Sequence, residues 1–138
     1  MRRFWFLVGL VCLGASSALA QDPVKVDPKH YKVEVENAQV RVLRIHYGPH
    51  ETSVMHGHPA GVAVFLTDSH GKFTFPDGKS EVRDSKAGQA GWTPGEIHLP
   101  ENLSDKPEEL ILVELKGKPA TSFQQRHRRW WPGVGKRP

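Results

Sequence analysis

The chain has 138 residues, enough for one domain of ordinary size. Its single cysteine, Cys12, lies in an N-terminal stretch that we expect to be removed, which excludes a disulfide, a cysteine ligand and a cysteine nucleophile from the mature protein. Residues 21–116 carry eleven Lys and Arg against all fifteen Asp and Glu, whereas residues 117–138 carry six Lys and Arg and no acid. The basic isoelectric point thus reflects a tail, which argues against a nucleic-acid-binding face on the domain.

The first twenty residues, MRRFWFLVGLVCLGASSALA, have the three parts of a secretory signal peptide. Arg2 and Arg3 are basic, an apolar run follows from residue 4 to residue 13, and Ala18-Leu19-Ala20 is a small-x-small cleavage site. The apolar run is too short for a membrane-spanning helix. We expect cleavage after Ala20 and a periplasmic or extracellular protein.

Residues 21–30 are a polar, proline-bearing lead-in, and residues 31–116 alternate in hydrophobicity as short strands with turns do. Residues 61–67, GVAVFLT, are nearly all apolar, as in a strand buried on both faces, and residues 76–79, PDGK, predict a hairpin turn. This pattern predicts a single all-β sandwich or barrel. The strands are expected at 31–37, 40–47, 61–67, 72–75, 80–84, 91–93, 96–100 and 109–116.

Residues 117–138 lack periodicity, and we expect most of them to be disordered. Within them, RHRRWWPGVGKRP mixes arginine with tryptophan, a composition that suits an anionic membrane surface or polymer. The alternative is a solvated tail without a partner.

Three of the eight histidines lie where they can form a site. His56 and His58 are two residues apart, so on an extended segment both rings project to the same side. Imidazole is a common ligand of divalent transition metals, and a third histidine from a neighbouring strand would give a three-histidine face with open positions. Alone, His-x-His is weak evidence for a metal site, because it also fits a loop rich in polar residues.

The residues around this pair and around His98 resemble the two motifs of the cupins, small β-barrel proteins. The first motif is represented by Gly48 and His56-Gly57-His58. The second is represented by Gly88, five residues, Pro94-Gly95, His98 and Asn102, with one residue missing between the proline and the glycine. The resemblance covers about residues 32–116 and is closest to small single-domain bacterial cupins.

The resemblance implies an antiparallel jelly-roll β-barrel over residues 31–116, with His56, His58 and His98 as ligands of a divalent ion. Iron, manganese, zinc and nickel are not distinguished. The family's fourth ligand, a glutamate, would fall on Val62 or Ala63, so it is missing here. His50 and Glu51 precede the pair and are candidates for an extra ligand.

Other residues are candidates for the pocket of such a barrel. Arg44 and His46 share one face of their strand, which either lines the barrel and meets an anionic ligand or faces solvent. Glu51, Glu96 and His46 are the candidates for an acid or base. Four aromatic residues are expected in the core or the pocket wall: Phe65, Phe73, Phe75 and Trp92.

The leading functional hypothesis is an exported cupin that binds a divalent metal and a small molecule, with dioxygenase-like or isomerase-like activity if it is an enzyme. The alternative is a metal-free barrel that binds a small ligand or a partner without catalysis. Whether the chain is an enzyme stays open at this point. The resemblance is also compatible with a homodimer formed through sheet edges.

Overall fold

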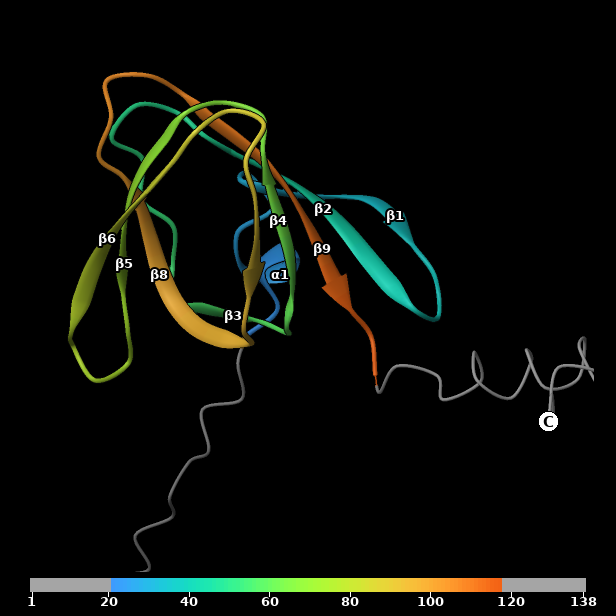
Figure 1. The fold of residues 1–138 in the computed structure, drawn as a ribbon. Coiled ribbons are helices and arrows are strands. Elements are labelled where there is room, and N and C mark those ends of the chain that lie inside the picture. The colour runs from blue at the N-terminus through green and yellow to red at the C-terminus, as the bar shows by residue number, and fades with distance from the viewer. Residues whose placement is uncertain (1–20, 118–138) are drawn as a thin grey trace, which may run out of the picture.

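The structure of this protein, a computed structural model, describes residues 21–117. The expected signal peptide lies outside the described residues, as does the expected basic tail apart from Gly117. Nine strands and one short helix, α1 (Pro23–Val26), make up the described part (Figure 1). No helix within residues 21–117 is long and apolar enough to cross a membrane.

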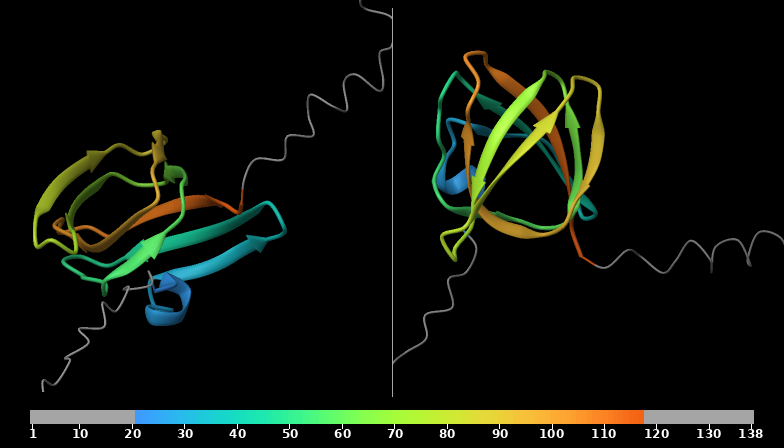
Figure 2. Two further views of the ribbon diagram at one scale, coloured as in Figure 1. Left: turned by 90° about the horizontal axis from the view of Figure 1, so that it is seen from below. Right: turned by 60° about the vertical axis from the view of Figure 1, so that its left-hand side comes forward.

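Two sheets face each other and enclose a barrel (Figure 2). In spatial order, the five-stranded sheet contains β1 (Tyr31–Glu36), β2 (Val40–Tyr47), β9 (Glu108–Leu115), β4 (Gly61–Phe65) and β7 (Ala90–Thr93). The four-stranded sheet contains β3 (His56–His58), β8 (Glu96–Asn102), β5 (Ser69–Thr74) and β6 (Ser80–Ser85). All the strand pairs are antiparallel, which confirms the predicted all-β jelly-roll class.

The turn at residues 76–79 is confirmed: β5 and β6 form a hairpin, and Gly78 takes the left-handed conformation with φ 82°. The prediction that residues 61–67 are buried on both faces is wrong. Most of β4 is half-buried and Leu66 is 42% exposed, because the barrel wall is one sheet thick. β3 was not among the expected strands, and it consists of the histidine pair and the glycine between them.

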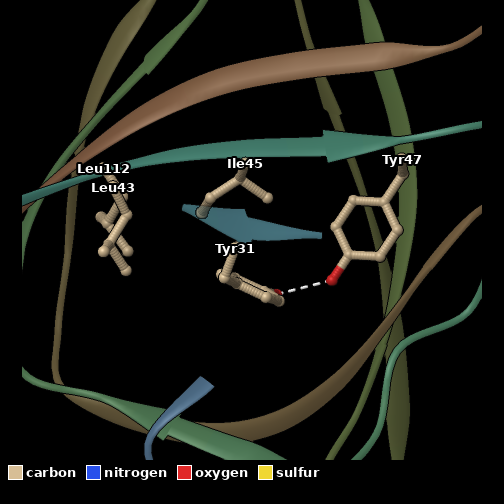
Figure 3. Close-up of a cluster of buried hydrophobic side chains, with 5 residues drawn as sticks. All are labelled: Tyr31, Leu43, Ile45, Tyr47 and Leu112. Atoms are coloured by element: carbon tan, nitrogen blue, oxygen red, sulfur yellow. Dashed lines mark hydrogen bonds between the residues drawn. The ribbon is translucent and has the colours of Figure 1, made fainter. Parts of the chain in front are cut away.

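The apolar core is small and lies between β1, β2 and β9 (Figure 3). Alternation along β2 turns Leu43, Ile45 and Tyr47 into the barrel, and Leu43 pairs with Leu112 of β9. Tyr31 of β1 completes this cluster. The rest of the barrel interior is therefore left for polar side chains and a cavity.

The N-terminal residues are bound to the barrel. Asp22 caps α1 by accepting a hydrogen bond from the backbone N–H of Val24 at 3.1 Å. The carbonyl of Gln21 accepts from the backbone N–H of Gly57 at 3.0 Å, directly between the two histidines of β3. This segment, expected as a lead-in, thus supports the short strand that carries His56 and His58.

The pairing of β4 with β9 requires a glycine at position 61. A Cβ atom at Gly61 would lie 2.2 Å from the carbonyl oxygen of Val113, whereas a Cβ at Gly91 of the neighbouring β7 would meet nothing within 4 Å. We expect Gly61→Ala to lower the free energy of unfolding by about 3 kcal/mol, because the clash is with backbone. Urea unfolding of both variants tests this. An equally small effect of Gly61→Ala and Gly91→Ala would contradict the close packing of β4 on β9.

Candidate metal centre

His56, His58 and His98 meet inside the barrel, as the sequence predicted. His56 of β3 pairs directly opposite His98 of β8, so the register of two strands places these rings side by side. One ring nitrogen of each histidine lies within 4.8 Å of the other two, and the Nε2 atoms of His56 and His58 are 3.0 Å apart. All three side chains are buried.

The Nδ1 atom of each ring is occupied by an acceptor from the protein. His56 Nδ1 is 2.7 Å from the carbonyl oxygen of Val54, which can only accept a hydrogen bond. His58 Nδ1 is 2.7 Å from a carboxylate oxygen of Glu114, and His98 Nδ1 is 3.0 Å from one of Glu96. Each Nδ1 therefore carries a proton, which leaves Nε2 as the ring nitrogen of each histidine that can ligate a metal.

Glu114 supports His58 and is itself held by Arg41. Its second carboxylate oxygen accepts from Nε of Arg41 at 2.5 Å, and Arg41 also donates to both carboxylate oxygens of Asp22, at 3.0 and 3.1 Å. Burial alone would raise the pKa of Glu114, but the hydrogen bonds from His58 and Arg41 outweigh burial and lower it. Glu114 is therefore a carboxylate at neutral pH and can only accept from His58.

Glu96 supports His98 in a similar way. Arg83 of β6 donates to its two carboxylate oxygens at 2.7 and 3.1 Å. Burial raises the pKa of Glu96, but the bonds from Arg83 prevail and the pKa is lowered. Glu96, a pocket candidate from the sequence, thus fixes the orientation of a histidine ring.

The fold holds two of the three imidazoles neutral, those of His56 and His98. Burial lowers the pKa of His56 to about 4 and that of His98 to about 4, and the neighbouring histidines add to the effect. Two Nε2 lone pairs facing each other at 3.0 Å repel unless a cation or a proton lies between them. Three imidazoles that lie close together, each with its Nδ1 atom bonded to the protein, are the donor set that a divalent transition metal prefers, so the residues fit such an ion.

A cavity of about 260 Å³ opens beside the three histidines. His58 and His98 line it, and Ala63 of β4 lies in its wall. Val62 and Ala63, one of which stands where the cupin resemblance would place a glutamate ligand, have no ligand atom in their side chains. Much of the remaining wall is apolar, with contributions from Ile45, Phe65, Phe73, Trp92, Leu110 and Leu112.

Two tyrosines border the cavity near the histidines. The hydroxyls of Tyr31 and Tyr47 are hydrogen-bonded at 2.6 Å (Figure 3), and the Tyr31 ring centroid lies 4.7 Å from that of His56. Burial raises the pKa of both phenols, so both stay protonated at neutral pH. His30 stacks on Tyr47 with 4.3 Å between ring centroids, which fixes the second ring.

The remaining sequence candidates lie away from this centre. Arg44 and His46 lie on the outer face of β2, where Arg44 forms ion pairs with Glu34 and Glu109. His50 is exposed and bonds to Asp105 at 2.7 Å.

Glu51 also has other partners than the three histidines. Its carboxylate bonds to Lys29, to His30 and to the backbone N–H of Gly48. These contacts lower the pKa of Glu51 to about 2, with the bond from Lys29 as the main cause. Within residues 21–117, the side chains grouped closely enough to hold one ion here are His56, His58 and His98.

The sequence reasoning missed Glu114, Arg41, Arg83 and the two tyrosines. One signal for Glu114 was present: in ELILVELK it shares its phase with Leu110 and Leu112, so it had to point into the barrel if they did. A carboxylate at a strand position that points into the barrel needs a buried hydrogen-bond or ion-pair partner.

No protein-family model matches the sequence, and none of the curated proteins does. Solved structures with the same fold exist. A cupin domain from Bordetella pertussis is 25% identical, with a TM-score of 0.59 over 63% of this chain and 92% of that one. An RmlC-like cupin with a double-stranded β-helix fold from Methanocaldococcus jannaschii is 20% identical, with a TM-score of 0.50 over 65% of this chain and 84% of that one.

This chain forms a small cupin domain. The structural similarity to these two proteins covers most of the described barrel. The cupin barrel of this chain brings together the histidines of both motifs.

The lowered pKa values predict how the stability of the metal-free cupin depends on pH. In the unfolded chain His56 and His98 bind protons near the ordinary value of 6.5, and in the folded chain only near about 4. Between these pH values the unfolded state holds more protons than the folded state. The contribution of the two histidines to the stability of the fold is therefore fully present above about pH 6.5 and is lost as the pH falls toward 4. The expected loss is on the order of a few kcal/mol.

Urea unfolding of chelator-treated protein between pH 4 and pH 6.5 measures this loss. The double variant His56→Gln/His98→Gln retains the other titrating groups and should show a flatter dependence. If the free energy of unfolding fell equally steeply with pH in the two proteins, these histidines would not be held neutral by the fold.

Proposed function

We propose that this protein is an exported cupin that binds a divalent metal ion through the Nε2 atoms of His56, His58 and His98 and presents a small molecule to that ion. The observation that carries the proposal is the set of Nδ1 hydrogen bonds, to the Val54 carbonyl and to the two supporting carboxylates, which leaves the other ring nitrogen of each histidine available in a group whose ligand atoms lie within 4.8 Å of one another. Structural histidines satisfied by the fold alone would not need to converge.

The ligand would enter the cavity beside the histidines. A divalent ion with three imidazole ligands and open positions supplies Lewis-acid or oxygen-activating chemistry. The apolar wall excludes water from the bound molecule, and the hydroxyl pair of Tyr31 and Tyr47 offers hydrogen bonds from the wall of the cavity. Export is supported by the signal-peptide pattern of the first twenty residues.

Elemental analysis of the mature chain, residues 21–138, tests the metal. We expect close to one divalent ion per chain as purified, or after anaerobic reconstitution with Fe²⁺, Mn²⁺, Zn²⁺ or Ni²⁺, and none in His56→Ala/His98→Ala. The matched control is His46→Ala/His70→Ala, which removes two exposed histidines. A mature chain that takes up no metal would leave a metal-free binding barrel as the better interpretation.

Glu114 is expected to tune the affinity of the site. Glu114→Gln keeps the shape of the side chain but removes the charge behind His58, so the imidazole becomes a weaker donor. We expect the affinity for Zn²⁺ to fall about 10- to 100-fold, measured by competition with a chromophoric chelator. Glu109→Gln, on the outer face of the same strand, should leave it unchanged. An equal effect of both variants would mean that Glu114 is not linked to the metal through His58.

A further inference from the structure

Three acidic side chains are buried in the described part of the chain, and one of them differs from the other two. Asp27 bonds to the ring of His30 at 2.6 Å, and Glu114 is bonded by Arg41. Glu108 is 7% exposed, yet within residues 21–117 its carboxylate has a serine hydroxyl as its partner and forms no ion pair. A buried carboxylate without a cation is costly, so such a group either takes up a proton or gains stability from a cation that a ligand supplies.

The one hydrogen bond to the Glu108 carboxylate among the described side chains comes from the Ser69 hydroxyl, at 2.7 Å. Burial raises the pKa of Glu108, and the bond from Ser69 and the nearby His70, which forms no ion pair with it, only partly offset this. Both residues line the cavity that also contacts His58 and His98. The carboxylate is thus a polar group in a largely apolar wall, and it is not used in the metal centre.

Glu108 and the histidines lie at opposite ends of this cavity. Along β9, residues 108, 110, 112 and 114 point inward in alternation, and Glu114 reaches His58 at one end of the row. Six residue steps of extended strand lead from Glu108 to Glu114, which is roughly 20 Å between their Cα atoms. Leu110 and Leu112 lie between them and form part of the apolar wall.

We infer that the cavity takes a small primary amine: a molecule with a metal-ligating head at the histidines, an apolar middle and an ammonium group at Glu108. This inference rests on the proposed metal-binding function and names its ligand class. The ammonium would supply the cation that Glu108 lacks among the described residues, and the leucine wall would contact the apolar middle. Charge-assisted bonds of this kind are the stronger ones in a site shielded from water.

Pairs of hydroxamate probes test the inference on the Zn²⁺-loaded mature chain. Aminocaproyl hydroxamate and caproyl hydroxamate share the metal-ligating head and chain and differ only in the terminal ammonium. Shorter and longer pairs, aminobutyryl with butyryl and aminocapryloyl with capryloyl, cover the length of the cavity. Isothermal titration calorimetry gives the affinity ratio within each pair.

We expect the amine of the best-fitting pair to bind about tenfold more tightly than its apolar partner. Glu108→Gln should abolish this preference, and Glu109→Gln, which changes the outward neighbour, should retain it. Glu108→Asp keeps the charge on a shorter side chain, so it should move the preference to a longer probe. If Glu108→Gln folds poorly, Glu108→Asp still tests whether the carboxylate binds the ammonium group.

Two failures are distinguishable. Hydroxamates that bind the wild-type protein with no preference for the amine at any length would overturn the ammonium site and leave the metal site standing. A preference that survives in Glu108→Gln would overturn it as well. Absence of hydroxamate binding to the metal-loaded protein would overturn the proposed function, and this inference with it.

Discussion

The hydrogen bond between His58 and Glu114 joins the two sheets of the barrel at the metal centre. His58 belongs to β3 of the four-stranded sheet and Glu114 to β9 of the five-stranded sheet. Arg41 of β2 and Asp22 before α1 extend this link to the N-terminal segment. The orientation of one ligand ring therefore depends on the closure of the whole barrel, and the centre forms only when both sheets are in register.

This dependence explains why a strand of three residues can hold two ligands. β3 pairs with β8 over His56, Gly57 and His58, and the Gly57 N–H also bonds to the Gln21 carbonyl. A segment this short has little stability of its own. It is fixed on one side by β8, on another by the N-terminal segment, and through His58 by β9.

The sequence was sufficient for the fold class and for the pair His56 and His58, because both depend on local patterns, whereas His98 was singled out by the resemblance to the cupin motifs. Alternation reveals strands, and His-x-His places two rings on one face whatever the surroundings. The partners of the rings could not be found this way. Glu114 lies 56 residues from His58 along the chain, and the strand order that brings them together has no local signature. The same holds for Arg83, which reaches Glu96 from a strand not paired with β8.

The error at residues 61–67 has a related cause. An apolar run is typical of a strand covered on both faces, but in this barrel the inward face of β4 borders a cavity and the outward face has no further layer. Its apolar residues serve the wall of a binding site as well as the core.

The apolar core and the polar centre are built on the same few strands. As a result, the cavity has an apolar middle and polar groups at its ends. Leu43, Ile45 and Leu112 pack together between β2 and β9, while the ends of β9 carry the two buried glutamates, Glu108 and Glu114. Arg41 and His58 bond to the two carboxylate oxygens of Glu114, so this group has its partners within the protein. Among the described residues Glu108 has a hydroxyl alone, so the interior carries an uncompensated acidic group at one end and unshared lone pairs at the other. Both ends favour a positive group, and a barrel with this interior is better suited to binding than to packing.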